Sequence, residues 1–419
     1  MLESFKSAFK VSELRTKLLY TLGMIFIFRL GAHIPVPGVI PERFAELVNS
    51  GAIFGFFDII SGGALKNFSV FAMGIMPYIN ASIILQLLTV VIPHLEKLHK
   101  EGEEGRKKIS QYTRYLTVVL AFIQGIGMVV GVSGSMQNPG PIAFTMAALT
   151  ITAGTTFLMW MGEQITERGI GNGISLLIFA GIVSRVPSGA VRLGEYLNAG
   201  TINIFSLIVL VIIAALVVAC VVAVQEGQRR IPVRYAKRVV GRRVYGGQTT
   251  HLPLRVNQAG VMPIIFASSL LMFPETIVNM FQGSAAASFY STYLGWGSAA
   301  HTIIYAMLII GFTYFYTAVV MNPNDVADNI KKYGGFIPGL RPGRPTAEFI
   351  TKIMSRVTFS GALFLALIAI LPTFVLMATK IPNIYFGGTS LLIVVGVALD
   401  TMKQVESHLL MRSYQGFIK

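Results

Sequence analysis

Residues 74–82 read GIMPYINAS and residues 260–268 read GVMPIIFAS, so Gly, Met, Pro, Ile, Ala and Ser recur at the same six places of a nine-residue window. The two copies start 186 positions apart, and each lies near the start of a long apolar stretch. A proline removes one hydrogen bond from a helix, so each copy marks an interrupted apolar segment. The position of the two copies in the order of apolar segments indicates the architecture.

The composition is that of a membrane protein. Apolar residues make up 53% of the 419 residues and charged residues only 13%, against about 25% charged in ordinary soluble domains. No Asp, Glu, Lys or Arg occurs between Arg114 and Glu163, or between Glu275 and Asp325. A membrane-spanning helix needs roughly 20 apolar residues, so these runs predict an all-α polytopic membrane protein.

Cutting the chain at charges and at Pro/Gly clusters gives ten candidate spans, which we expect to be helices because the backbone in lipid must form its hydrogen bonds internally. The candidate spans are residues 18–37, 68–93, 113–134, 142–162, 170–187, 203–224, 257–274, 301–321, 357–378 and 383–401. The first 17 residues lack the apolar core of a cleavable signal peptide, so we expect the first span to be retained. The single cysteine, Cys220, excludes an intramolecular disulfide, and we expect it to be buried as a small apolar side chain.

The distribution of positive charge orients the spans. If the N-terminus is cytoplasmic, 28 of the 34 Lys and Arg residues fall on the cytoplasmic side and 5 on the other side. Positive residues accumulate on the cytoplasmic side of membrane proteins, so both termini are predicted to be cytoplasmic. The net charge of +15 is therefore explained by orientation and does not by itself indicate nucleic-acid binding.

The repeated phrase falls in the second and the seventh span, five spans apart. An odd offset places the second copy upside down relative to the first, which is typical of an inverted repeat with the interrupted helices facing a central site. The sequence therefore predicts two five-helix halves, residues 1–187 and 188–419, around a central pore, with chance similarity of two apolar helices as the competing explanation.

The candidate spans hold almost no ionisable side chains. Arg29 lies in the first span and Glu163 at the end of the fourth, while His33 and His301 lie near span ends. Ion-coupled transporters need ionisable ligands near the midplane, and an intramembrane enzyme needs a nucleophile with a base. We expect no enzyme, no metal and no cofactor, and favour a passive conduit driven from outside over an ion-coupled secondary transporter of a small solute.

Two long loops on the predicted cytoplasmic side are basic. Residues 225–256 hold eight Lys and Arg residues against one Glu, and their alternating pattern with Gly turns predicts a protruding hairpin. Residues 322–356 contain PGLRPGRP, a rigid turn that presents Arg341 and Arg344. Both loops fit docking to RNA phosphates or to an acidic protein face, and equally fit ordinary positive-inside charge.

The stretch FFDIISGGALKNFS, residues 56–69, is apolar, Gly-broken and too short to span. From its residues alone it is either a re-entrant or interfacial helix or a loop anchor.

The sequence resembles the SecY family of the bacterial Sec protein translocon over essentially its whole length. The matching motifs include SGGAL, GEQITERGIGNGIS, GRRVYGGQTTHLPLRVN and FGGTSLLIVV. The resemblance implies a protein-conducting channel in the cytoplasmic membrane, whose two halves open so that unfolded polypeptide crosses the centre. Transmembrane segments would leave through a lateral gate between spans two and three on one side and seven and eight on the other.

The resemblance also implies roles for particular residues. The pore ring would be formed by Ile75, Ile79, Ile174, Ile178, Ile265 and Ile393, with Ile264 leaving the register open by one residue in span seven. The plug would be formed by Phe57, Asp58, Ile59, Ile60, Ser61, Gly62, Gly63, Ala64, Leu65, Lys66 and Asn67. Polar members of the lateral gate would be Gln86 and Asn257.

The same resemblance implies partners. Arg242, Arg243 and Arg341 would dock the ribosome or the SecA ATPase, and the small membrane subunits SecE and SecG would accompany the channel. Its substrates would be unfolded secretory and membrane proteins with signal sequences, handled in contact with the lipid bilayer.

Overall fold

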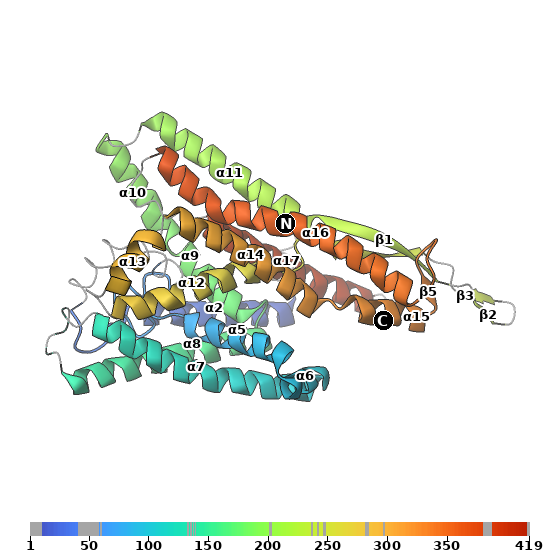
Figure 1. Cartoon of the computed structure of the whole chain (residues 1–419), viewed down its shortest axis with the longest axis horizontal. Coiled ribbons are helices and arrows are strands. Elements are labelled where there is room, and N and C mark those ends of the chain that lie inside the picture. Colours follow the sequence, from blue (N-terminus) through green and yellow to red (C-terminus); the bar gives the residue numbers. More distant parts are fainter. Residues whose placement is uncertain are drawn as a thin grey trace.

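The structure, a computed structural model, describes most of the chain. The described residues are 11–40, 58, 61–131, 134, 136, 138, 140–200, 203–235, 238–240, 243–245, 249–280, 285–295, 298–379 and 388–416. Helices dominate, and a small β-structure extends from one end of the helical body (Figure 1).

The N-terminal part of the chain is helical except for its loops. Its helices are α2 (Ser12–Gly31), α5 (Met76–Val91), α6 (Pro93–Lys100), α7 (Glu103–Gly131), α8 (Pro141–Arg168), α9 (Gly173–Val183) and α10 (Val186–Asn198).

The C-terminal part adds the strands to a second set of helices. Its helices are α11 (Ile204–Glu226), α12 (Met262–Met280), α13 (Ala285–Tyr293), α14 (Ala299–Val320), α15 (Pro323–Lys332), α16 (Arg344–Thr379) and α17 (Gly388–Gly416). Its strands are β1 (Gln228–Tyr235), β2 (Arg238–Val240), β3 (Arg243–Tyr245), β4 (Thr249–Arg255) and β5 (Gly335–Phe336).

Each of the ten candidate spans overlaps at least one helix of the structure, so the all-α membrane class is confirmed. Six helices of the described residues are long and apolar enough to cross a membrane, or up to seven if α5 and α6, bent by 101°, form one broken span. Pro93 in the first turn of α6 accounts for this bend, because the ring prevents α5 from continuing.

Several predicted boundaries are wrong, for identifiable reasons. The second span was expected from residue 68, yet α5 begins only at Met76, because Gly74 has a φ of +55° and Pro77 stands in the first helical turn. The first helix ends at Gly31 and not at 37, since the IPVPG sequence at 34–38 cannot continue it. In the other direction, α16 begins thirteen residues before its candidate span and includes part of the predicted loop.

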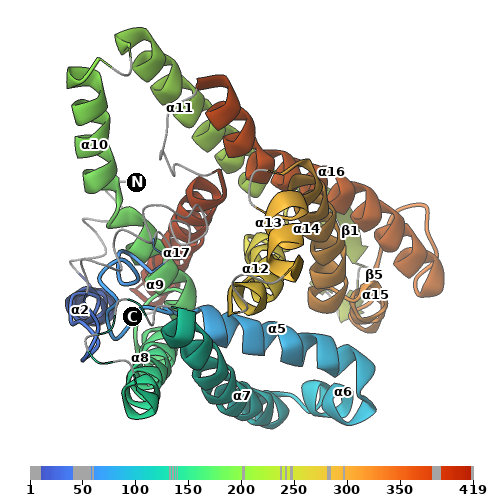
Figure 2. The ribbon, with the colours of Figure 1, turned by 60° about the vertical axis from the view of Figure 1, so that its left-hand side comes forward.

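The two sets of helices meet along the middle of the molecule. Within the first set α7 packs against α5 and α8, and within the second α14 packs against α12 and α16. Between the sets, α12 packs against both α5 and α7, and α17 packs against α9 (Figure 2). The chain passes from one set to the other through α10 and α11, which form a V on the opposite side of the molecule in the same view.

The predicted basic hairpin is confirmed. Strands β1 and β4 pair antiparallel from Gln228 with Arg255 to Arg234 with Thr249, and the short strands β2 and β3 pair beyond them. Figure 1 shows β2 and β3 at the far end of the hairpin, away from the helices. The base of the hairpin is anchored because Ile231, Val233 and Leu254 form an apolar cluster with residues of α15 and α16.

The expected burial of Cys220 is wrong, since this free cysteine is exposed on α11. Only Val217 and Val221 of α11 are buried within the described chain. A sequence does not distinguish an apolar side chain that faces lipid from one that is buried in protein, because lipid tails are as apolar as a protein core.

Candidate functional site

The first two predicted ring residues lie at the start of α5. The conformation of Gly74 is one that glycine adopts without steric penalty, and it turns the chain directly into the helix. Ile75 and Ile79 follow one helical turn apart, with the Ile79 N–H donating to the Ile75 carbonyl at 3.1 Å. Both side chains are buried, with exposed fractions of 4% and 6%.

The GIGNG sequence leads into α9, which carries the next two predicted ring residues, Ile174 and Ile178. Asn172 caps this helix by accepting a hydrogen bond from the Ser175 N–H at 3.1 Å. A Cβ on Gly173 would overlap the carbonyl oxygen of Gly162, so the glycine lets α9 approach α8 closely. Of the two predicted ring residues on α9, Ile178 is buried and Ile174 is partly buried.

Two neighbouring isoleucines of α12, Ile264 and Ile265, belong to different apolar clusters. Ile265 belongs to the central apolar cluster that also contains Ile75, Ile79 and Ile178. Ile264 is only 1% exposed but belongs to a different cluster, formed with residues of α11, α14, α16 and α17.

Helix α17 supplies the last predicted ring residue, Ile393, which is 3% exposed. The structure therefore places all six predicted isoleucines in or against one apolar cluster, although they come from four helices spread along the chain. The same cluster includes Phe266 and Val397 and residues of α2 and α8.

A cavity of about 490 Å³ lies over this cluster. Ile178, Ile265 and Ile393 line it on the apolar side. Its remaining lining is largely polar and comes from both parts of the chain, including Asn172, Ser175, Gln225, Arg255, Asn257, Asp400, Lys403 and Gln404. The site is thus a polar cavity ending on a layer of branched apolar side chains, built from helices of both sets.

The stretch after the first span packs against the same apolar cluster. Residues 61–75 form successive turns and not a helix, and most of them are buried. Ala64 belongs to the same cluster as the six isoleucines, while Leu65 and Phe68 belong to the adjacent cluster with residues of α7 and α8. Of the predicted plug residues, Phe57, Ile59 and Ile60 lie outside the described residues.

Polar contacts also tie this stretch to two helices. Asp58 forms an ion pair with Arg185, the residue that precedes α10, and one of its carboxylate oxygens accepts the Lys66 N–H at 2.7 Å. The carbonyl oxygen of Gly62 accepts a hydrogen bond from the Arg29 guanidinium of α2.

The two predicted polar gate residues have different surroundings. Asn257 lies just before α12, is 6% exposed, lines the cavity and donates to the Gly260 carbonyl at 3.0 Å. Gln86 lies on α5, is half-buried and is not among the residues lining that cavity. The structure therefore does not bring the two side chains together around the cavity.

The two basic loops are joined by one three-stranded sheet, in the order β4, β1, β5. Arg234 pairs with Phe336 and Tyr235 with Gly335, so the hairpin is hydrogen-bonded to the strand that leads into the PGLRPG turn. This connection was not predicted, because a two-residue strand leaves no pattern in the sequence. Among the predicted docking residues, Arg243 lies in β3 and Arg242 lies outside the described residues.

The predicted rigid turn is present at residues 338–343. Gly339 and Gly343 have φ values of +83° and +104°, and the Arg341 carbonyl accepts the Thr346 hydroxyl at 2.8 Å. The Arg341 side chain is exposed. Beside this turn, a cavity of about 470 Å³ is lined by residues from the start of α16 and by Asn324.

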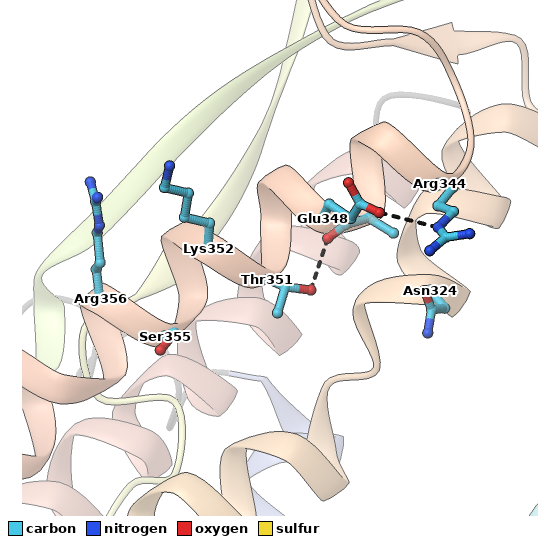
Figure 3. A pocket seen from close by; sticks show the side chains of 8 residues that line it. Asn324, Arg344, Glu348, Thr351, Lys352, Ser355 and Arg356 are labelled. Atoms are coloured by element: carbon cyan, nitrogen blue, oxygen red, sulfur yellow. Dashed lines mark hydrogen bonds and ion pairs between the residues drawn. The ribbon is translucent and has the colours of Figure 1, made fainter.

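Figure 3 shows the cationic side chains around that second cavity. Arg344 donates to the Glu348 carboxylate at 3.1 Å, which offsets its charge, while Lys352 and Arg356 extend from α16 on one side. The start of α16 thus continues the positive surface of the turn.

No group of three or more His, Cys, Asp or Glu side chains in the described part of the chain could hold a metal ion. The two intramembrane charges noted in the sequence are both partnered within protein. Arg29 bonds the Gly62 carbonyl, and Glu163 accepts from Arg114 of α7 at 2.8 Å.

These features define a helical membrane channel: a layer of apolar side chains lies under a polar cavity, and one sheet joins the two basic loops. The SecY family model matches residues 69–402. The protein translocase subunit SecY of Halalkalibacterium halodurans is 50% identical to this chain over 435 residues, covering 100% of both chains. The chain belongs to the SecY family.

Solved structures show the same fold. A structure described as that of a protein conducting channel has a TM-score of 0.68 and 20% identity, covering 94% of this chain and 92% of that one. Sec61 in the canine ribosome–channel complex from the endoplasmic reticulum has a TM-score of 0.64 and 18% identity, with the same coverage.

Proposed function

We propose that this chain is the channel through which unfolded secretory polypeptides cross the cytoplasmic membrane and from which transmembrane segments enter the lipid. The observation that supports this most directly is the gathering of six isoleucines from α5, α9, α12 and α17 into one cluster beneath a polar cavity. Branched apolar side chains offer no hydrogen-bonding partner, so they close around a chain of any sequence and exclude water when empty.

The halves 1–187 and 188–419 would separate around this ring. Because α12 packs against α5 and α7, parting of these helices would open a path from the cavity into the lipid. Residues 57–67, the plug segment, would leave their place against the ring when the channel opens.

The channel has no energy source of its own in this proposal. The ribosome or the SecA ATPase would bind the basic hairpin and the turn at Arg341, with both termini of the chain cytoplasmic. SecE and SecG would be the accompanying small subunits. The ribosome-bound Sec61 channel, which shares this fold, supports a ribosome partner for the family.

The transporter alternative finds no support among the relatives, which are protein translocase subunits. The described residues also offer no cluster of acidic or histidine ligands for a coupling ion.

Site-specific crosslinking tests the pore. Cysteine would replace Ile79, Ile178 or Ile265 in a chain whose Cys220 is changed to Ser, and a polypeptide arrested during translocation would carry a photo- or thiol-reactive probe. We expect strong crosslinks at these three positions. Matched controls are cysteines at Ile142 and Phe205, which are 80% and 73% exposed and face outward. Crosslinks confined to the two control positions would overturn the pore assignment.

A further inference from the structure

The plug segment is held by polar contacts as well as by apolar packing. We propose that Arg185 and Arg29 form a latch that keeps this segment closed and must be released in a step separate from the parting of the two halves. The inference rests on the proposed role of residues 57–67 as the plug.

The first part of the latch is the Asp58–Arg185 ion pair. The side chains are 7% and 22% exposed, so the pair lies largely out of water. Removing one partner of a buried ion pair leaves the other charge without compensation, which is strongly unfavourable. The Lys66 N–H holds the same carboxylate at 2.7 Å, so the pair fixes both ends of the described plug segment.

The second part is the hydrogen bond from Arg29 to the Gly62 carbonyl. An arginine within a membrane-spanning helix is costly and needs an acceptor. Here the acceptor is the main-chain carbonyl of Gly62, and the close approach of this residue to α9 requires a glycine. Gly62 has a φ of +68°, and a Cβ there would lie 2.9 Å from the Gly181 Cα of α9. The Ser184 hydroxyl lies 3.5 Å from the same carbonyl.

All of these partners belong to residues 1–187. Parting the two halves along α12 therefore breaks none of the latch contacts. The plug segment stays bound to the N-terminal half until a passing chain or a movement of α2 or α9 displaces it. Opening of the lateral gate and release of the plug are consequently two events with separate energetic costs.

The leak of small ions through resting channels tests the latch. The full chain with its co-purifying subunits would be reconstituted in liposomes without substrate, and chloride flux would be measured. Arg185→Ala and Asp58→Asn should each raise the flux about tenfold or more. The first variant leaves the Asp58 carboxylate without its cation, and the second leaves the Arg185 guanidinium without its anion. The exchange Asp58→Arg with Arg185→Asp should lower the flux again but only in part, because the ion pair is restored while the Lys66 N–H loses its acceptor.

Glu195→Gln is the matched control, since this exposed carboxylate lies on α10, the helix that Arg185 precedes, and its loss should leave the flux unchanged. Thermal unfolding of each complex separates a leak from misfolding, and the exchange variant provides a folded comparison if a single variant is unstable. Wild-type flux in both folded single variants would overturn the latch.

A second measurement separates the latch from the plug itself. Cysteines at positions 58 and 185, with Cys220→Ser, would be joined by a short bifunctional thiol reagent. Efficient joining that blocks translocation supports both proposals. Joining that leaves translocation intact means that the segment need not move, which overturns the plug role. If the latch variants do not leak while deletion of residues 57–67 does, the latch alone is wrong.

Discussion

Ile264 and Ile265 are adjacent in the chain but pack into two different apolar clusters. Ile265 packs with the isoleucines of α5, α9 and α17, whereas Ile264 packs with residues of α11, α14 and α16. Successive residues of a helix point about 100° apart, so Ile265 faces the central apolar cluster and Ile264 faces the interior of the second set of helices. If the central cluster forms the pore ring as proposed, Ile265 contributes to the ring and Ile264 does not.

Substitution at these two positions should have different consequences. Ile265→Asn places an amide in the constriction, where it can bind water, so we expect a raised ion leak with little change in thermal stability. Ile264→Ala removes buried apolar volume from a packed core and should destabilise the protein by about 2–5 kcal/mol without a leak. Flux assays and thermal unfolding of the two variants, side by side, check this. A leak from Ile264→Ala alone would reverse the assignment.

The contact between α8 and α9 depends on Gly173. Gly173→Ala would force a methyl group against the Gly162 carbonyl, and overpacking of this kind costs about 1–3 kcal/mol. The matched control is Gly194→Ala on α10, where nothing lies within 4 Å of the added Cβ. There the higher helix propensity of alanine should stabilise the protein by up to about 1 kcal/mol. Equal unfolding temperatures for the two variants would contradict the close approach.

Reversal of one charge on the rigid turn should uncouple the channel from its motor. In Arg341→Glu we expect loss of motor-driven translocation, while insertion into the membrane and folding are unchanged, because the side chain is exposed and the turn is set by glycines. Arg15→Glu is the control, since it makes the same charge change on an exposed part of α2. Normal translocation by the Arg341 variant would show that the turn does not dock the motor.

The tip of the hairpin should be separable from its base. Replacing residues 236–247 by Asn-Gly, a preferred two-residue hairpin turn, should leave the β4–β1–β5 sheet intact, because a turn of this length keeps the register in which Arg234 pairs with Thr249. We expect an unchanged unfolding temperature with weaker binding of ribosomes or SecA in sedimentation assays. A large loss of thermal stability would mean that the tip contributes to the fold.

The apolar pattern predicted the helices well and their ends less well. Long uncharged runs leave few alternatives to a helix in lipid, which is why each candidate span overlaps a helix. Residues 68–75 are as apolar as the helix that follows them, so hydropathy alone could not show that they form turns. The signals that end this stretch, Gly74 and Pro77, are visible in the sequence, and giving them more weight would have corrected the boundary.

The contacts within the site were less accessible to prediction. The Arg29 partner lies 33 residues away and is a carbonyl oxygen, which every residue possesses. Asp58 and Arg185 are further apart still, and nothing local to either residue indicates the pairing. The difference between Ile264 and Ile265 depends on the rotation of α12 about its own axis relative to the neighbouring helices. Two identical side chains at adjacent positions do not indicate this rotation.

Helix α16 runs without interruption through 36 residues, from Arg344 beside the rigid turn to Thr379. At 1.5 Å per residue it is about 54 Å long, well beyond the roughly 30 Å of a hydrocarbon core. Its first turns therefore stand outside the bilayer, attached to the sheet that joins both basic loops. If a motor docks on these loops as proposed, a force on either loop is transmitted along α16 to α14 and α17, against which this helix packs.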